Sequence, residues 1–209
     1  NEIRSIRNNS KKITPISKFD PNVTVSELKK GIFLIHRENP LVETFVLHSY
    51  LKGGLSEENK KNNGAFSLIS SLLSASNKSL SQIEIKNFFE EKASSLSSFS
   101  GKNAYGLTLN GLSKDFNLLV GQFMNCLQSP LFKKEDLKLE KEMSLRNIKS
   151  QKQDPVRLCF NKVAQNAFPS LPYSMSNIGT ITSLKSASSK KLKQIHQEKL
   201  DSQVILFTY

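Results

Sequence analysis

The stretch ETFVLHSYLKGGLSEENKKNNGAFSLISSLLS, residues 43–74, carries the change of pattern that determines the fold class. Its first ten residues alternate apolar and polar side chains and are rich in aromatic and β-branched types, which indicates a strand. Beyond the pair Gly53-Gly54, apolar residues recur with the spacing of one helical face. These residues are Phe66, Ile69, Leu72 and Leu73. We therefore expect a strand followed by a buried helix at the centre of the domain.

Upstream of this stretch, residues 31–36 (GIFLIH) form a second apolar run of strand length. The connection to residues 43–52 is short, so we expect the two strands to form a hairpin. His36 and His48 would then face each other across the hairpin. No carboxylate stands at a defined spacing from them, and we interpret them as ordinary strand histidines rather than zinc ligands. Residues 1–26 are polar and interrupted by prolines, which indicates a lead-in or linker before a single domain at 27–209.

Downstream, Ser81 and Glu84 form a capping-box pattern at the start of a second helix. Further elements follow from their periodicities. The sequence predicts strands at 95–100, 103–112 and 204–209, and helices at 114–128, 134–152, 155–168 and 188–199. The resulting order, β-β-α-α-β-β-α-α-α-α-β, predicts an α+β domain with a mainly antiparallel sheet covered on one face by helices.

Composition excludes several classes of protein. The chain has 209 residues, 37% hydrophobic and 23% charged, which is too apolar for a disordered chain. No apolar run approaches the roughly 20 residues of a membrane-spanning helix, so we expect no membrane span. The net charge of +12 would attract acidic partners. However, the lysines are spread along the chain, arginine is scarce and tryptophan is absent, so we expect no nucleic-acid partner.

Motifs alone reveal no active site. The chain contains no phosphate-binding loop of the Gly-x-x-x-x-Gly-Lys-Ser/Thr type, no Gly-x-Gly-x-x-Gly and no Gly-x-Ser-x-Gly. Cys126 and Cys159 are far apart, and no sequence motif pairs either of them with a histidine, so we interpret them as buried free thiols on two helices.

The order and spacing of short motifs are more informative. Five segments carry the pattern: Gly53-Gly54-Leu-Ser-Glu57, Gly111-Leu112-Ser-Lys-Asp115, residues 127–132 (LQSPLF), Gln153-Asp-Pro155, and a Leu-Pro-Tyr173 loop leading to Gly179-Thr180. This arrangement resembles a domain of the pitrilysin, insulinase and mitochondrial processing peptidase family of zinc metallopeptidases. The resemblance covers residues 25–209 and implies a processing-peptidase-like metallohydrolase fold.

Catalytic members of that family carry the inverted zinc motif His-x-x-Glu-His on the first helix. The resemblance places this motif on Ser67, Ser70 and Ser71, and the third ligand, a glutamate, on Asn147. Glu140, two turns earlier on the same helix, is still acidic. Hydroxyls do not replace imidazoles as zinc ligands, and a serine is no general base near neutral pH. The resemblance therefore implies no catalytic residue, no metal and no cofactor in this domain, which by itself is not an enzyme.

Within such a family, the absence of the zinc ligands from this domain has a functional interpretation. We expect a non-catalytic domain of a zinc metalloendopeptidase that encloses the chamber and contacts peptide substrate, while a homologous half on the same or another chain carries the zinc. The family binds peptide along a sheet edge, and the matching edge would be residues 103–112, with Asn103, Tyr105, Leu107 and Leu109 as candidate contacts. The alternative is a stand-alone, non-peptidase scaffold or interaction subunit of the same fold. The sequence leaves the compartment open.

Overall fold

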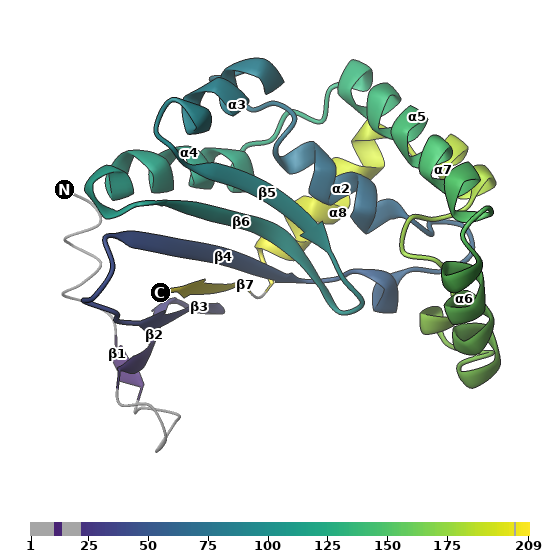
Figure 1. Ribbon diagram of the computed structural model, residues 1–209, viewed down its shortest axis with the longest axis horizontal. Coiled ribbons are helices and arrows are strands. Elements are labelled where there is room, and N and C mark those ends of the chain that lie inside the picture. The colour runs from purple at the N-terminus through teal and green to yellow at the C-terminus, as the bar shows by residue number, and fades with distance from the viewer. Residues whose placement is uncertain (1–10, 14–21, 203) are drawn as a thin grey trace.

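The computed structural model describes residues 11–13, 22–202 and 204–209, which form one layer of strands and one layer of helices (Figure 1). The strands make a seven-stranded sheet with the order β1-β2-β3-β7-β4-β6-β5. Their bounds are Lys11–Ile13 (β1), Val23–Lys29 (β2), Ile32–Arg37 (β3), Thr44–Lys52 (β4), Ser95–Ser100 (β5), Ala104–Leu112 (β6) and Val204–Thr208 (β7). Within the described part of the chain, neighbouring strands are antiparallel except for β3 and β7. The predicted α+β class with a mainly antiparallel sheet is confirmed.

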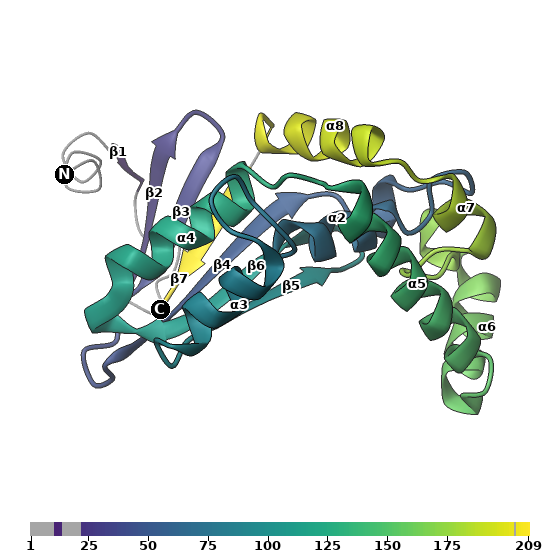
Figure 2. The same cartoon turned by 90° about the horizontal axis from the view of Figure 1, so that it is seen from above.

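Most of the helices lie on one face of this sheet, and the helix at residues 155–167 lies beyond the end of the strands, as the two perpendicular views show (Figures 1 and 2). The α-helices are Ala65–Leu73 (α2), Gln82–Glu90 (α3), Phe116–Gln128 (α4), Lys134–Gln151 (α5), Pro155–Ala167 (α6), Ile181–Ser186 (α7) and Ser189–Leu200 (α8). Three single turns of 3-10 helix, Leu55–Glu57 (η1), Ser113–Asp115 (η2) and Pro172–Ser174 (η3), connect them. Among the described residues, no helix combines the length and the apolarity that crossing a membrane requires.

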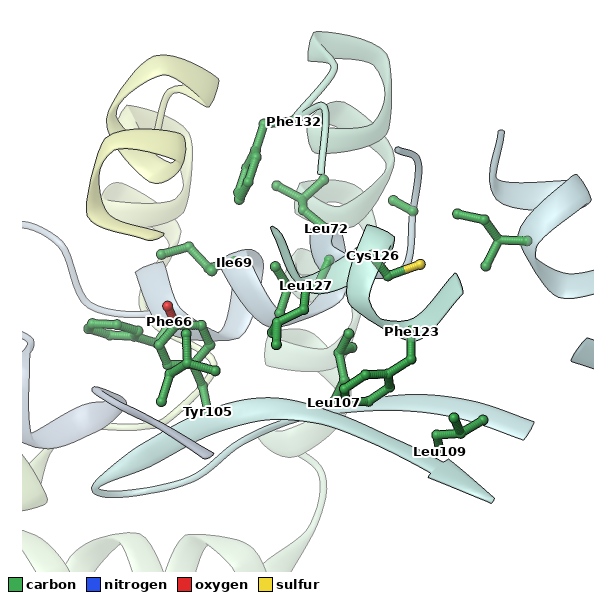
Figure 3. Packing of buried hydrophobic residues seen from close by; sticks show 14 of the residues in the cluster. Phe66, Ile69, Leu72, Tyr105, Leu107, Leu109, Phe123, Cys126, Leu127 and Phe132 are labelled. Carbon is green, nitrogen blue, oxygen red and sulfur yellow. The ribbon is translucent and has the colours of Figure 1, made fainter. Parts of the chain in front are cut away.

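The core lies between α2, α4 and the strand β6 (Figure 3). Tyr105, Leu107 and Leu109 project from β6 toward the helices and are fully buried, as their alternation predicts. Ile69 and Leu72 of α2 cover them. Each buried leucine or isoleucine of this kind contributes about 1.5–3 kcal/mol to the free energy of unfolding, so this layer fixes α2 against the sheet.

Local signals place the helix boundaries. The capping box of α3 is present, with Glu84 Oε2 accepting from the Ser81 backbone N–H at 2.8 Å. Helix α6 begins at Pro155, and the side chain of Asp154 accepts from the Arg157 N–H at 3.1 Å. The sequence did not predict α7, a short helix capped by Thr180.

The predicted hairpin between residues 31–36 and 43–52 is wrong, because β7 lies between β3 and β4. The hairpin partner of β3 is β2, which precedes it across a tight turn at Lys30-Gly31. His36 pairs in register with Thr208, and His48 pairs with Phe207. The two histidines are therefore separated by a strand and do not face each other.

Strand β2 crosses the predicted boundary between a lead-in of 1–26 and a domain of 27–209. Its residues Val23 to Ser26 pair with β3, and Lys11–Ile13 pair with β2, so these parts of the lead-in belong to the sheet. Residues 1–10 and 14–21 lie outside the described residues, and the linker role of that part stays a prediction.

Candidate functional site

The helix α2 carries the three positions at which the family resemblance expects zinc ligands and the general base. Ser70 is buried, and its hydroxyl donates to the Ser67 carbonyl at 2.9 Å, one turn back along the helix. Ser67 and Ser71 are half-buried. A serine hydroxyl that donates to a carbonyl of its own helix is hydrogen-bonded without a ligand, so the Ser70 hydroxyl needs no bound group.

Helix α5 supplies the remaining two positions. Glu140 is buried against α2, where burial raises the pKa of its carboxyl and a hydrogen bond with the Ser71 side chain lowers it in part. Asn147 lies two turns further along α5 and is exposed, and it lines an open cavity of about 370 Å³ together with Gln151 and Arg157. The structure thus places Ser71 beside Glu140, whereas Asn147 lies in the open cavity at the other end of this part of α5.

These residues do not fit a zinc ion. A serine hydroxyl and a carboxamide are poor zinc ligands compared with imidazole, thiolate and carboxylate. Among the described residues, no group of three or more histidine, cysteine, aspartate or glutamate side chains is arranged to hold a metal. A lone Glu140 carboxylate provides one ligand at most, so no metal-dependent step is assigned to this helix pair.

The start of α2 is held by a carboxylate that sequence reasoning missed. Glu58 accepts from the backbone N–H of Gly64 at 2.7 Å and of Phe66 at 2.9 Å, and from the Asn63 side chain at 2.9 Å. Burial raises the pKa of Glu58, and these hydrogen bonds oppose that effect. A carboxylate at a helix N-terminus compensates the unpaired N–H groups there. The only signal in the sequence was an acidic residue shortly before the helix.

His196 and His48 make hydrogen bonds within the core and the sheet. His196 Nε2 lies 2.7 Å from the Leu127 carbonyl, so it carries the proton and donates, and Nδ1 accepts from the Tyr105 hydroxyl at 2.9 Å. Burial lowers the pKa of His196 below its usual range. His48 Nδ1 lies 2.9 Å from the Thr108 hydroxyl. The three histidines come from separate places in the fold.

The predicted edge strand at residues 103–112 is wrong, because β6 lies between β4 and β5. Tyr105, Leu107 and Leu109 are fully buried in the core and cannot contact a peptide. Asn103 instead lies in the turn between β5 and β6, where its side chain accepts from the Tyr173 hydroxyl at 2.7 Å. The pattern of apolar residues shows which face of a strand is buried, but the position of a strand within a sheet depends on distant pairings.

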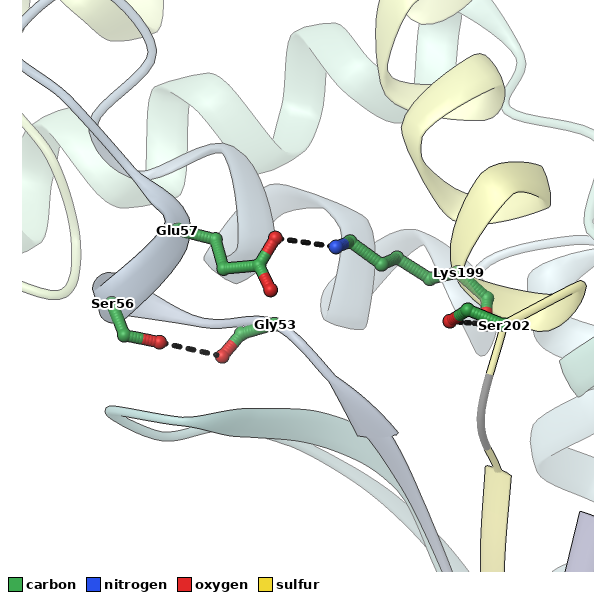
Figure 4. A network of polar contacts seen from close by, with 5 residues as sticks. All are labelled: Gly53, Ser56, Glu57, Lys199 and Ser202. Atoms are coloured by element: carbon green, nitrogen blue, oxygen red, sulfur yellow. Dashed lines mark hydrogen bonds and ion pairs between the residues drawn. The ribbon is translucent and has the colours of Figure 1, made fainter. Parts of the chain in front are cut away.

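The edge of the sheet on this side is β5. Its sequence SLSSFS contains no charge and no proline, the two devices that commonly protect an edge strand. The turn that follows β5 is held firmly: the N–H of Leu55 donates to the Gly101 carbonyl at 3.2 Å and the N–H of Ser56 to the Lys102 carbonyl at 2.8 Å. An ion pair between Glu57 and Lys199 joins η1 to α8 (Figure 4).

An apolar groove of about 440 Å³ opens beside this turn. Lys102 lines one side, and Phe160, Val163 and Phe168 of the α6 region line the other. Helix α6 has no buried residue, and Phe160 is 70% exposed. The groove thus lies beside the turn that follows the edge strand β5.

The three serines of α2 provide a direct test of this description. Replacing Ser67, Ser70 and Ser71 together by alanine is expected to change the free energy of unfolding by no more than about 1 kcal/mol, because alanine favours the helix and only local hydroxyl contacts are lost. Thermal unfolding followed by circular dichroism measures the effect. The matched control is Leu72→Ala in the same helix, which removes a fully buried side chain and should cost about 2–5 kcal/mol. Loss of folding in the triple variant would show that the serines have a structural role.

Comparison with known proteins is consistent with this geometry. The sequence model described as "Insulinase (Peptidase family M16)" matches residues 37–181. The non-peptidase homolog YmxG of Helicobacter pylori is 25% identical over 161 residues, which are 77% of this chain and 37% of that protein.

Two solved structures share the fold. A protease from Helicobacter pylori superposes with a TM-score of 0.84 at 14% identity, over 91% of this chain and 46% of the other. A peptidase M16 inactive domain from Pseudomonas fluorescens superposes with a TM-score of 0.79 at 17% identity, over 96% of this chain and 46% of the other. The chain thus spans less than half the length of each of these relatives.

The family match extends over more than half of the chain, and its relatives include a non-peptidase homolog and an inactive domain. The His-x-x-Glu-His motif of the catalytic members does not occur in the sequence. The chain belongs to the insulinase family, peptidase family M16.

Proposed function

We propose that this domain forms a non-catalytic wall of a zinc peptidase, where it encloses the chamber and binds peptide substrate. The zinc and the chemistry would belong to a homologous half on the same or another chain. The observation that carries the proposal is the edge strand β5, which carries no charge and no proline, together with the apolar groove beside the turn that follows it.

Strand β5 can bind an extended peptide by strand addition. In the described sheet it pairs with β6 on one side, and its outer side has no neighbouring strand. The backbone N–H and C=O groups on the outer side of an edge strand pair with an added strand, which provides affinity independent of sequence. Specificity must then come from pockets beside the strand.

The groove beside the β5–β6 turn supplies such a pocket. A peptide that runs along β5 toward Ser100 reaches Lys102 and then the apolar side chains Phe160 and Val163. Lys102 and Arg157 line the same groove, and the chain has a net charge of +12. The preferred ligand is therefore an extended peptide with a bulky apolar residue and acidic neighbours.

Removal of the apolar wall should weaken peptide binding. Phe160→Ser is expected to raise the Kd at least tenfold, since burial of a phenylalanine side chain contributes about 1.5–3 kcal/mol. The probe is a fluorescein-labelled twelve-residue peptide of alternating threonine and valine with one phenylalanine flanked by aspartates. Fluorescence anisotropy at low and high salt gives the Kd and its charge dependence.

The matched control is Ile83→Ser on α3, since Ile83 and Phe160 are both 70% exposed and Ile83 lies outside the groove. It should bind the peptide as the unchanged protein does. Absence of peptide binding at millimolar concentration, or equal loss in both variants, would contradict the proposal that this domain contacts substrate.

A second candidate function is a stand-alone scaffold or interaction subunit of the same fold. The name of the YmxG relative, a non-peptidase homolog, favours it. The two functions differ in the proteins with which this chain would form a stable complex. A polypeptide with the His-x-x-Glu-His motif, in the same chain or in a stable complex purified under native conditions, supports the peptidase wall, and its absence from that complex supports the scaffold.

A further inference from the structure

The apolar groove beside α6 and the open cavity beside α5 share one wall. Gln151, Arg157 and Ile178 line both of them. The groove, of about 440 Å³, is otherwise mainly apolar on its α6 side, where Phe160 and Val163 lie. The open cavity, of about 370 Å³, is otherwise polar and is lined by Asn147, Ser150 and Asp154. Arg157 therefore lies at the boundary between an apolar and a polar surface.

Segments far apart in the chain build the apolar groove, and hydrogen bonds hold them together. The Tyr173 hydroxyl of η3 donates to Asn103 Oδ1 in the β5–β6 turn at 2.7 Å. The Asn63 side chain donates to the Ser176 carbonyl at 2.9 Å, which fixes the loop that follows η3. Leu55, which also lines the groove, is only 2% exposed. The groove is thus formed before a ligand arrives, and binding need not order its walls.

The apolar groove contains two cations that no acidic group within it neutralises. Lys102 and Arg157 line it, and none of the described residues that line it is acidic. The Nε atom of Arg157 lies 3.9 Å from Oδ2 of Asp154 in the open cavity, which is longer than a hydrogen bond. Lys102 is exposed and forms no ion pair within the described part of the chain. The ligand that suits this groove combines a bulky apolar group with a negative charge.

The geometry of an extended peptide determines where that negative charge can be. Successive side chains of a strand point to opposite sides. When one residue places its apolar side chain in the groove, the side chains of its two neighbours therefore point away from the groove. A carboxylate that shares the groove with this side chain is most simply the α-carboxylate of the same residue, which only the last residue of a chain has.

We propose that the apolar groove binds the carboxyl-terminal residue of a peptide. A bulky apolar side chain packs against Phe160 and Val163, and the terminal carboxylate pairs with Lys102 and Arg157. The proposal rests on the proposed function and narrows its ligand from an internal segment to a free chain end. The preceding residues of the peptide lie along β5 and run parallel to it, because β5 runs toward the turn beside the groove.

The test compares peptides that differ at the carboxyl terminus. Two fluorescein-labelled twelve-residue peptides of alternating threonine and valine end in phenylalanine, one with a free carboxylate and one with an amide. A third peptide has an internal phenylalanine between two aspartates and an amidated end. In fluorescence anisotropy, the free carboxylate is expected to bind about tenfold or more tightly than either amide, because only it brings an anion and a phenylalanine into the groove on one residue.

Substitutions in the protein locate the carboxylate. Arg157→Gln removes the cation and keeps a side chain that can hydrogen-bond, and it should reduce the ratio of the two Kd values to about twofold or less. Lys102→Gln, on the other side of the groove, is a second variant and should also reduce the ratio. The matched control is Lys162→Gln, since Lys162 is an exposed cation of α6 that does not line the groove. It should leave the ratio unchanged.

The outcomes separate this proposal from the proposed function. Equal binding of the free carboxylate and the terminal amide would overturn it and leave peptide binding as such intact. Tighter binding of the peptide with internal aspartates would overturn it in favour of an acidic side chain. An equal loss of the ratio in Lys162→Gln and Arg157→Gln would overturn it in favour of a general effect of charge. If none of the three peptides binds at millimolar concentration, this proposal and the proposed peptide binding both fail.

Discussion

Replacement of Gly106 by alanine is expected to lower the free energy of unfolding by about 3 kcal/mol or more, and the melting temperature by roughly 10 °C. A Cβ atom at Gly106 would lie 1.8 Å from the Ser49 carbonyl oxygen and 2.8 Å from its carbon. These are backbone atoms of the adjacent strand β4, which cannot rotate away as a side chain can. The two central strands must therefore separate.

The separation would break a specific set of bonds. The Ser49 hydroxyl is buried between the two strands, where it accepts from the Leu107 N–H at 2.9 Å. A shift of β6 away from β4 leaves both groups unpaired in the core, which costs about 1–3 kcal/mol each. Urea and thermal denaturation measure the loss.

Gly121 provides a matched control. It lies inside α4, and a Cβ there would meet nothing within 4 Å. Gly121→Ala should stabilise the protein by about 0.5–1 kcal/mol, because glycine is unfavourable in a helix interior. If Gly106→Ala and Gly121→Ala had effects of the same sign, the close approach of β4 and β6 would be incorrect.

Rebuilding the family's ligands should restore metal binding. The variant Ser67→His, Ser71→His and Asn147→Glu is expected to hold one equivalent of zinc with a Kd below about 1 μM, since two imidazoles and one carboxylate form a known catalytic zinc set. The unchanged protein is expected to retain none after dialysis. Calorimetric titration and elemental analysis by mass spectrometry give the affinity and the stoichiometry.

The control keeps the two histidines and replaces Asn147 by glutamine, which cannot donate a carboxylate. It should bind zinc at least tenfold more weakly than the full set. A folded triple variant that binds no zinc would contradict the assignment of these positions to the family motif. Stoichiometric, tightly held zinc in the unchanged protein would contradict the conclusion that the domain is non-catalytic.

Local patterns predicted much of the fold. The helical spacing of Phe66, Ile69 and Leu72 indicated a buried α2, and these residues are buried in the core. The capping box at Ser81 and the proline at the start of α6 were also read correctly. Such signals succeed because propensity, capping and periodicity depend on residues within one or two turns of each other.

The candidate site was predictable only in part. The resemblance located Ser67, Ser70, Ser71 and Asn147, and α2 and α5 are neighbours in the structure. The peptide edge was placed on the wrong strand, since β5 and β6 have similar sequence signals and only the pairing of β6 with β4 makes it internal. The ring contacts of His48 with Phe207 and of Tyr50 with Phe99 were not foreseen, because these residues come from strands far apart in the chain.

By itself, the sequence determined most of the helices and strands and the buried faces of α2 and β6, and it showed that the family's His-x-x-Glu-His motif is missing. It did not indicate β1, β2 or α7. Tertiary structure alone decided the order of the strands, including the insertion of β7 between β3 and β4 and the position of β5 at the edge. It also decided the ring contacts among Tyr50, His48 and Phe207. The physical reason is the range of the interactions. A strand's alternation is encoded by its own residues, but its neighbours are chosen by the total apolar surface that one arrangement of the whole chain can bury.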